Sequence, residues 1–312
     1  MGKIFDPKDH ELPYGCSEFA QSPQAIVLED RVRVFFATRV RDTETTFLSH
    51  VAYADFDFGF STILDVSSEP VLPLGELGTF DQHGIFPISV VRSGDLLYGY
   101  TTGWSRRVAV SVDTSIGLAV SRNDGRTFER IGPGPVMAAA ANEPYLVADG
   151  FVQIHDGVFH MWYIFGTKWS LGATSGNPER VYKIAHATSA DGINWERNAE
   201  PIIEDRIGED ECQALPTVLE IGGKHHMFFC YRGHDGFRSG SESSYKIGYA
   251  VSEDMIDWTR DDNASGLSTP AGDWDSEMQC YPSIVRVHDE VFLLYNGNQF
   301  GREGFGCSKL QR

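Results

Sequence analysis

Apolar and polar residues alternate with a period of two in short runs along most of the chain. These runs are rich in β-branched and aromatic residues and end at Gly, Asp or Asn, a pattern that predicts β-strands. The clearest stretch predicts strands at 151–154, 158–164 and 182–189, with an Asp156-Gly157 turn after the first. A fourth, outer strand follows near Trp195. Because no stretch has the 3.6-residue period of an amphipathic helix, no helix longer than about three turns is expected.

This group of strands returns five times at nearly constant spacing. Each copy opens at a residue pair, and the pairs are Ser22-Pro23, Phe86-Pro87, Asp149-Gly150, Leu215-Pro216 and Tyr281-Pro282. The second residues of successive pairs are 64, 63, 66 and 66 positions apart. A fixed period filled with strands predicts an all-β fold, a five-bladed β-propeller with mostly four-stranded antiparallel blades. Since the repeat spans residues 1–312, we expect a single domain.

The fifth copy is too short for four strands. It ends near Leu310 and supplies about three strands on the spacing of the other copies. The N-terminal segment at residues 3–5 is apolar enough to add the missing outer strand. Such a strand would close the ring and cover an open sheet edge.

Composition and charge narrow the classes of partner. The net charge of −18 argues against nucleic acid or an anionic membrane as the main partner, since both require a basic surface. No run of about 18 apolar residues predicts a membrane span, and the N-terminus lacks the apolar core of a signal peptide. Five cysteines, odd in number and without a CxxC motif, are typical of reduced thiols, so we expect a cytoplasmic protein.

Glutamate recurs at one position before the repeat pair. Glu18, Glu211 and Glu277 each lie five residues before the proline of their pair, and Gln213 lies three before its proline. On an extended strand these offsets share one face. If the innermost strands line a central channel, the glutamates converge there, and we predict catalytic roles for Glu211 and Glu277 and a substrate-binding role for Glu18 and Gln213. The alternative for each single glutamate is that it is an exposed turn residue without a functional role.

Further acids precede two of the pairs. Asp81 and His83 lie before Pro87, and Asp275 lies before Pro282. Glycosyl transfer requires one protonated carboxyl and one ionised carboxyl in the same site, so Asp81 is a third catalytic candidate, with His83 and Asp275 as substrate-binding residues. Clustered carboxylates beside His83 also permit a metal site, but the His and Cys spacing matches no zinc pattern. We therefore expect no metal and no cofactor.

The loops that leave the second strand of each copy carry aromatic residues, arginine and amides. Trp104, Arg232, Arg238 and Asn298 are the substrate-binding candidates among them. A tryptophan face stacks on a sugar ring, and a guanidinium fork binds carboxylate or phosphate with two hydrogen bonds. The alternative for Arg232 and Arg238 is a structural ion pair with acids such as Asp235 or Glu242.

These residues together resemble a known family. Stretches 210–213, 228–232, 245–250, 274–278 and 295–298, with the five-fold repeat, resemble the five-bladed propeller glycosidases of families 43, 32, 68 and 130. The nearest resemblance is to glycosidase-like proteins of bacterial surface-polysaccharide biosynthesis. In family 43 an Asp before the first repeat proline is the general base. Here that residue is Ser22, and only the third copy has an acid at the pair, Asp149, which we predict to bind substrate.

The sequence therefore favours a carbohydrate-active enzyme that cleaves or transfers a glycosyl unit with paired carboxylates. The first alternative is a glycan phosphorylase or glycosyltransferase in surface-polysaccharide biosynthesis, with the arginines holding phosphate. The second is a propeller that binds sugar without catalysis. The expected partner is a carbohydrate or a sugar phosphate, and neither nucleic acid nor a membrane.

Overall fold

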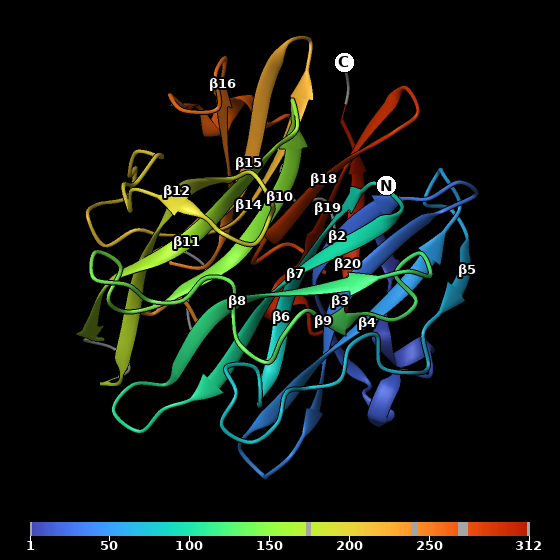
Figure 1. Cartoon of the computed structure of the whole chain (residues 1–312), viewed down its shortest axis with the longest axis horizontal. Coiled ribbons are helices and arrows are strands. Elements are labelled where there is room, and N and C mark those ends of the chain that lie inside the picture. Colours follow the sequence, from blue (N-terminus) through green and yellow to red (C-terminus); the bar gives the residue numbers. More distant parts are fainter. Residues whose placement is uncertain (1, 173–175, 239–242, 268–273, 311–312) are drawn as a thin grey trace.

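A computed structural model describes residues 2–172, 176–238, 243–267 and 274–310, which fold as antiparallel sheets with short connections (Figure 1). The first three repeats each form one four-stranded group. Sheet one contains β2 (Glu18–Val27), β3 (Val32–Arg41), β4 (Phe47–Phe56) and β5 (Ile63–Val66). Sheet two contains β6 (Gly84–Ser93), β7 (Leu96–Arg106), β8 (Val112–Ser121) and β9 (Glu129–Arg130). Sheet three contains β10 (Val147–His155), β11 (Val158–Leu171), β12 (Pro178–Ser189) and β13 (Glu196–Arg197).

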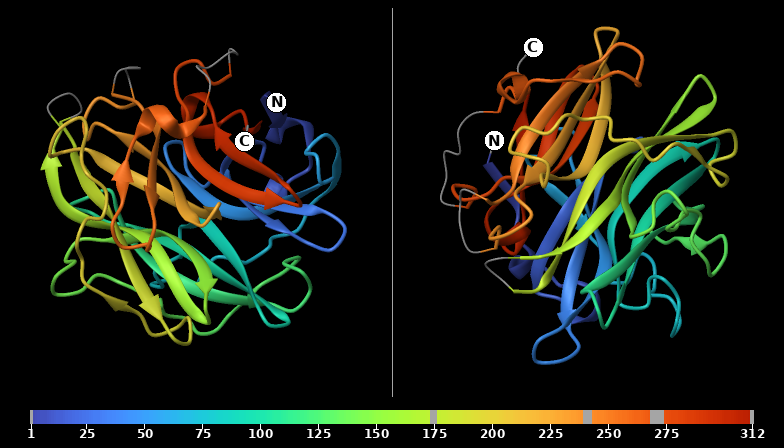
Figure 2. Two further views of the ribbon diagram at one scale, coloured as in Figure 1. Left: turned by 90° about the horizontal axis from the view of Figure 1, so that it is seen from above. Right: turned by 90° about the vertical axis from the view of Figure 1, so that its left-hand side faces the viewer.

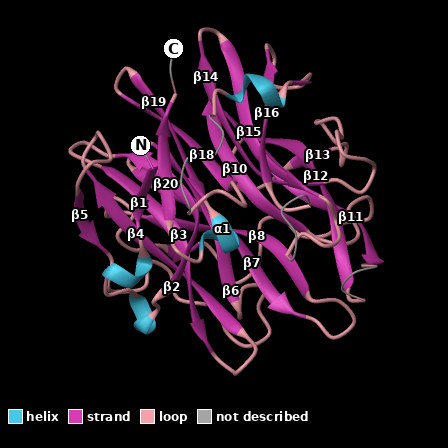
Figure 3. Cartoon of the chain, turned by 180° about the vertical axis from the view of Figure 1, so that it is seen from behind, coloured by secondary structure: helices cyan, strands magenta, loops and turns pink. Residues whose placement is uncertain are grey.

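The last two sheets complete the repeat, and the N-terminus supplies one of their strands. Sheet four contains β14 (Cys212–Ile221), β15 (Lys224–Arg232), β16 (Lys246–Ser252) and β17 (Thr259–Arg260). Sheet five contains β18 (Cys280–Val287), β19 (Glu290–Asn296), β20 (Phe305–Lys309) and β1 (Gly2–Phe5). Strand β1 pairs with β20, as Figure 3 shows, so the expected closure by residues 3–5 is confirmed.

The helical segments in the described part of the chain are short. They are three 3₁₀ turns, η1 (Pro7–Asp9), η2 (Pro13–Gly15) and η3 (Asp262–Ser265), and one turn labelled α1 (Asn298–Gly301). The expected absence of long helices therefore agrees with the described residues. Among these, no helix has the length and apolar character needed to cross a membrane.

The five strand groups, or blades, are arranged as a ring around their first strands, and a parallel pairing of Ser49 in β4 with Gly84 in β6 joins blades one and two into one eight-stranded sheet. Strand β2 contacts β6, β6 contacts β10, β10 contacts β14, β14 contacts β18, and β18 returns to β2. The first and last segments of the chain consequently lie side by side, as the two views of Figure 2 show. The fold is therefore the five-bladed β-propeller that the spacing predicts.

The repeated turns have the structural role that their sequence indicates. Asp156 and Gly157 have φ values of 50° and 80° and join β10 to β11, where His155 pairs with Val158. Two successive positive φ values are the geometry of a tight hairpin turn. In the next turn of the same blade, Ser189 Oγ accepts the Gly192 amide at 2.9 Å. Hydrogen bonds of this kind explain the recurring Ser and Asp without any catalytic role.

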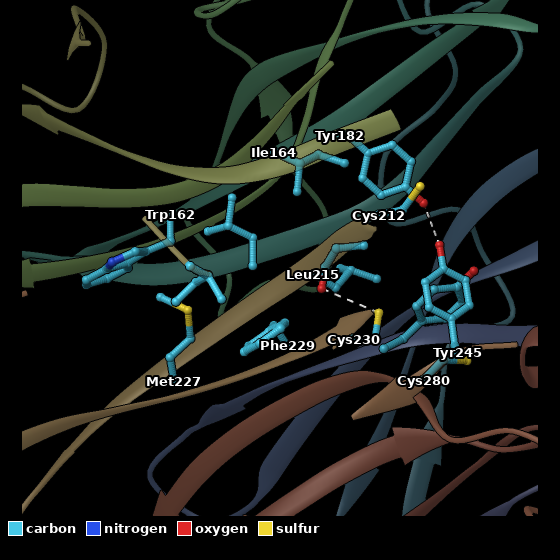
Figure 4. Packing of buried hydrophobic residues seen from close by; sticks show 14 of the residues in the cluster. Trp162, Ile164, Tyr182, Cys212, Leu215, Met227, Phe229, Cys230, Tyr245 and Cys280 are labelled. Atoms are coloured by element: carbon cyan, nitrogen blue, oxygen red, sulfur yellow. Dashed lines mark hydrogen bonds between the residues drawn. The ribbon is translucent and has the colours of Figure 1, made fainter. Parts of the chain in front are cut away.

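Aromatic and sulfur-containing side chains fill the space between blades. In one buried cluster, Trp162 and Tyr182 of blade three pack with Met227 and Phe229 of blade four, and Figure 4 shows Trp162 near Met227 and Tyr182 beside Cys212. Trp162, Met227 and Phe229 have no exposed surface. Burial of each such side chain contributes about 1.5–3 kcal/mol, which fixes the positions of the strands that carry the site.

Candidate functional site

A cavity of about 1020 Å³ lies where the first strands of the five sheets converge. All five sheets contribute to its wall through residues of their innermost strands, namely Gln21, Phe86, Asp149, Ala214 and Tyr281. This cavity is of the size that ligand sites usually have. It is the central funnel of the propeller.

The repeat pair marks a bend in each innermost strand. The register with the second strand shifts at the pair in every sheet. The first residue of four pairs has a left-handed backbone, with φ of 54° at Ser22, 55° at Asp149, 48° at Leu215 and 57° at Tyr281. Such conformations are costly for residues other than glycine and concentrate at functional sites. Here the bend places Asp149 and Tyr281 on the cavity wall.

Asp149 is a buried carboxylic acid on this wall. Its side chain is 7% exposed, its amide donates to Thr102 Oγ1 at 2.7 Å, and its Oδ2 accepts the Leu215 amide at 3.4 Å. Burial raises the pKa of Asp149 to about 7, although the Leu215 amide and the charge of Arg180 act to lower it. The group can therefore donate a proton at neutral pH.

Glu277 is the other acidic side chain among the described residues of the wall. It is exposed, in contrast to Asp149. Asn298 Oδ1 accepts the Glu277 amide at 2.8 Å, and Ser244 Oγ donates to the Glu277 carbonyl at 2.9 Å. These bonds hold the backbone of Glu277 at the funnel, where the sequence predicts this residue.

The predicted placement of Glu211 and Asp81 in the channel is wrong. Neither lines the cavity, and both are buried in ion pairs. The same arrangement recurs in three blades, at Asp81–Arg130 (2.5 Å), Glu143–Arg197 (2.6 Å) and Glu211–Arg260 (2.6 Å). Each pair joins the segment before the innermost strand to the outermost strand of the same sheet. The recurrence of these acids is therefore structural.

Gln213 and Asp275 also lie away from the cavity wall. Gln213 Nε2 donates to Glu211 Oε1 at 3.1 Å, so it belongs to the buried network of blade four. Asp275 is buried and its Oδ2 accepts from the Tyr295 hydroxyl at 3.0 Å. Neither residue lines the cavity wall, and their contact with a substrate stays a prediction.

Trp104 lines the cavity as expected, and His83 lies behind it. The two rings stack with centroids 6.0 Å apart. Gly84 permits this position of the indole, because a Cβ on Gly84 would lie 2.1 Å from Trp104 Nε1. His83 Nδ1 is 3.4 Å from the Arg106 amide, and burial, followed by the charge of Arg106, lowers the pKa of His83. His83 and Asn298 therefore support wall residues, and neither lines the wall itself.

Arginine is the most frequent charged residue of the wall. Six arginines line it, namely Arg39, Arg106, Arg180, Arg232, Arg238 and Arg302. Three have a carboxylate partner: Arg106 with Asp42 at 2.8 Å, Arg238 with Glu179 at 2.5 Å and Arg302 with Glu18 at 2.8 Å. Glu18 thus neutralises a wall residue and does not line the wall. The ion pair of Arg238 is with Glu179, and Glu242 lies outside the described residues.

The other three arginines have no carboxylate partner in the described part of the chain. Arg232 is buried, lies 3.5 Å above the Phe237 ring and donates to the Tyr182 hydroxyl at 2.9 Å. Among the described residues, the Arg180 side chain has a ring contact with Tyr182, at 5.9 Å, and its charge acts on Asp149. The funnel therefore concentrates uncompensated positive charge within a chain of net charge −18, which is the electrostatic character of an anion-binding site.

Sequence reasoning missed Arg39, although a signal for it was present. The run Phe35-Phe36-Ala37-Thr38-Arg39 in the first repeat matches Phe228-Phe229-Cys230-Tyr231-Arg232 in the fourth. Both runs lie in the second strand of their sheets, and both arginines line the cavity. Arg180 lies near the start of the third strand of its blade, β12, and no repeated motif indicates it.

Sequence comparison finds a relative along the whole chain and another along part of it. No model of a known protein family matches the chain. The uncharacterised protein Rv1502 of Mycobacterium tuberculosis is 31% identical over 311 residues, covering 100% of this chain and 98% of that protein. A 1,2-beta-oligomannan phosphorylase of Thermoanaerobacter is 28% identical over 138 residues, 43% of this chain and 44% of that protein.

Solved structures show the same architecture. One glycoside hydrolase matches with a TM-score of 0.74 at 15% identity, over 100% of this chain and 91% of that one. A member of family 130, whose mannoside phosphorylases include hydrolases of β-1,2 mannosidic linkages, matches with a TM-score of 0.68 at 14% identity, over 98% and 90%. A family-43 hydrolase matches with a TM-score of 0.67 at 15% identity, over 95% and 90%. The chain thus belongs to one family with the mycobacterial protein Rv1502, and its fold is that of the five-bladed propeller glycosidases.

Proposed function

We propose that this protein is a glycosyl-processing enzyme whose active site lies in the central funnel. We further propose that it cleaves a glycosidic bond by phosphorolysis. The observation that carries this proposal is the buried Asp149 carboxyl, on which the charge of Arg180 acts, together with the lack of a carboxylate partner for Arg180 among the described residues. One group can donate a proton, and the other can hold the anion that replaces the leaving group. The phosphorylase similarity over 138 residues supports the same class of reaction.

The proposed reaction uses one protein acid. Asp149 donates its proton to the glycosidic oxygen as the bond between that oxygen and the anomeric carbon breaks. A phosphate oxygen, held by Arg180 and Arg232, forms the new bond to the anomeric carbon. The products are a sugar 1-phosphate and an alcohol that keeps the Asp149 proton, and the proton of the hydrogen phosphate passes to Asp149 and restores its carboxyl. Because phosphate is the nucleophile, no second carboxylate is required.

Hydrolysis is the second candidate, because Glu277 lines the same cavity as Asp149. An inverting hydrolase uses one carboxylic acid and one carboxylate, which activates water. The buried Asp149 and the exposed Glu277 would fill these roles. The excess of arginine on the wall has no purpose in that reaction, which is why we rank phosphorolysis first.

The wider setting of the proposal is a cytoplasmic enzyme of polysaccharide biosynthesis that handles a sugar phosphate. Buried, unpaired thiols support a reducing compartment: all five cysteines are buried and none is in a disulfide. Phosphorolysis produces a sugar 1-phosphate. Once activated, such a compound can serve as a glycosyl donor in biosynthesis.

The experiment compares turnover of a panel of aryl glycosides and β-linked mannosides with and without inorganic phosphate. Wild type should release the leaving group only with phosphate, and phosphorus NMR should detect the sugar 1-phosphate. Asp149→Asn should lower kcat by about 10²–10⁴-fold, the usual range for a general acid. Glu277→Gln is the matched control and should retain most of the phosphate-dependent rate.

Each other outcome points to a rival function. Release without phosphate that Glu277→Gln abolishes would replace phosphorolysis by hydrolysis. Binding of sugars without turnover under either condition would leave the sugar-binding propeller and overturn the proposal.

A further inference from the structure

Arg39 has a guanidinium with no partner in the described structure. It lies on β3 and lines the cavity, and its Nε is buried without a hydrogen bond. Its surroundings are aromatic, because the Phe19 ring lies 5.0 Å away and the Tyr281 hydroxyl is the group that acts on its charge. Burial lowers the pKa of Arg39, but an arginine remains protonated at neutral pH.

The neighbouring arginines do not share this condition. Arg302 approaches the same Phe19 ring, at 5.8 Å, and is paired with Glu18. Arg106, which also lines the wall, is paired with Asp42 and donates to the Phe47 carbonyl at 2.8 Å. A buried charge without compensation destabilises a fold. An anion bound in the cavity would therefore neutralise the guanidinium charge of Arg39.

Arg39 is on the opposite side of the ring from the proposed phosphate site. It belongs to blade one, whereas Arg180 and Arg232 belong to blades three and four. Tyrosines occupy the wall between the two positions. Tyr182 and Tyr245 share a hydrogen bond of 2.7 Å between hydroxyls, visible in Figure 4, and the Tyr245 and Tyr281 rings are 5.5 Å apart. A phosphate beside Arg180 would therefore leave Arg39 available for another group.

We infer that Arg39 binds an anionic substituent, a carboxylate or a phosphate ester, carried by the sugar substrate itself. The inference rests on the proposed function and deepens it, because it makes the substrate an acidic glycan. The guanidinium fork would hold two oxygens of the anion. The rings of Phe19 and Tyr281 exclude water around the pair, which strengthens the attraction.

The test is calorimetric binding to the ligand-free protein, without turnover. The ligands are glucuronate, galacturonate, glucose 6-phosphate and mannose 6-phosphate, each beside its neutral parent sugar. Wild type should bind at least one acidic sugar about tenfold more tightly than its parent, which corresponds to about 1.4 kcal/mol. A preference for the uronates assigns a carboxylate, and a preference for the sugar phosphates assigns a phosphate ester.

Two variants make the test specific. Arg39→Met should abolish the preference for the acidic sugar, whereas Arg92→Met removes the same charge outside the cavity and should preserve it. Arg39→Met should melt at the same or a higher temperature than wild type, because an apolar side chain replaces a half-buried charge whose buried Nε has no hydrogen bond. A lower melting temperature would instead show that Arg39 supports the fold.

The proposal is overturned if no acidic sugar binds more tightly than its parent, or if the preference survives in Arg39→Met. Either outcome is independent of the proposed function, since phosphate-dependent cleavage would still be measured on neutral glycosides. Conversely, a preference for acidic sugars in a protein that cleaves nothing would support Arg39 as a binding residue and reject the phosphorylase.

Discussion

At the scale of single residues, two carboxyl groups of one cavity have opposite environments. Asp149 is buried and its pKa is raised to about 7, whereas Glu277 is exposed at the same wall. Separation of this kind is how one site holds both a proton donor and an ionised group. The raised pKa also has a consequence for stability, because the unfolded chain ionises Asp149 at much lower pH.

We expect Asp149→Asn to stabilise the fold at alkaline pH. The folded pKa is above the unfolded value, so the native state binds more protons between about pH 4 and 7, and wild-type stability falls as the pH rises through this window. At pH 8 the variant should exceed wild type by up to roughly 4 kcal/mol. Near pH 4 the two should agree. Asparagine also tolerates the φ of 55° at this position.

Urea unfolding at pH 4, 6 and 8 measures this difference. Glu277→Gln is the control, and its stability should follow wild type at each pH because the side chain is exposed. A difference between Asp149→Asn and wild type that stays constant from pH 4 to pH 8 would contradict the buried, neutral carboxyl.

At the scale of strands and loops, the sequence predicts the blades but misplaces their acids. The repeat spacing and the Asp-Gly turns identify the strands, since both depend on local backbone chemistry. The orientation of the side chains before each pair cannot be predicted in this way, because these residues lie in loops: Glu211 directly precedes β14, and Glu277 lies three residues before β18. Alternation with a period of two does not extend into these loops, and the register shift at each pair interrupts it further.

The arginine partners were equally hidden from sequence reasoning. Arg130, Arg197 and Arg260 are 49, 54 and 49 residues after the acids they bind. Each acid meets its arginine only when the fourth strand folds back onto the same blade. No local sequence pattern predicts this ion pair.

We expect Glu211→Gln to destabilise the protein, in contrast to a catalytic carboxylate. The substitution removes the charged partner at 2.6 Å from the Arg260 guanidinium, itself 1% exposed, which keeps only its second carboxylate partner, Asp262 at 3.0 Å, among the described residues. Loss of a buried hydrogen bond to a charged group costs about 1–3 kcal/mol. Chemical unfolding should show this loss, and Glu277→Gln should show none. The double variant Glu211→Leu with Arg260→Met should recover a large part of it. Wild-type stability in Glu211→Gln would reject the structural role.

A stack of histidines in blade three should make the fold sensitive to acid. His186 lies 5.2 Å from the His160 ring and 5.3 Å from Trp162. Burial, followed by the neighbouring His160, lowers the pKa of His186 to about 4. Below about pH 6.5 His186 is protonated in the unfolded chain but stays neutral in the folded chain. The free energy of unfolding therefore falls as the pH drops towards 4.

Melting temperatures from pH 7 to pH 4 compare wild type with His186→Gln. The variant should lose less stability over this range, by up to roughly 3 kcal/mol. It should keep part of the acid sensitivity, because burial also lowers the pKa of His50 in blade one to about 4. Identical pH slopes in the two proteins would contradict the neutral, buried state of His186.

At the scale of the whole molecule, the ring is closed by a strand from the other end of the chain. Strand β1 completes blade five, and its Phe5 is 2% exposed. The Phe5 ring lies 4.9 Å from Phe36 of blade one and 5.1 Å from Phe305 of blade five. One side chain thus joins the first and last blades. We propose that the five blades form a single domain, because each contacts its neighbours and this junction leaves no open end.

We expect Phe5→Ala to destabilise every blade together. Removing a buried phenyl group costs about 3–5 kcal/mol through lost burial and a residual cavity. Since the ring has no other end, the loss should appear in one transition: far-ultraviolet dichroism and tryptophan fluorescence, to which the buried Trp162 of blade three contributes, should shift to the same lower urea midpoint. Leu77→Ala, at a side chain that is 97% exposed, is the control and should leave the midpoint unchanged. If Phe5→Ala instead shows an early transition by one probe while the other keeps the wild-type midpoint, blade five opens alone. The other four blades would then remain folded without blade five, and the single-domain proposal would fail.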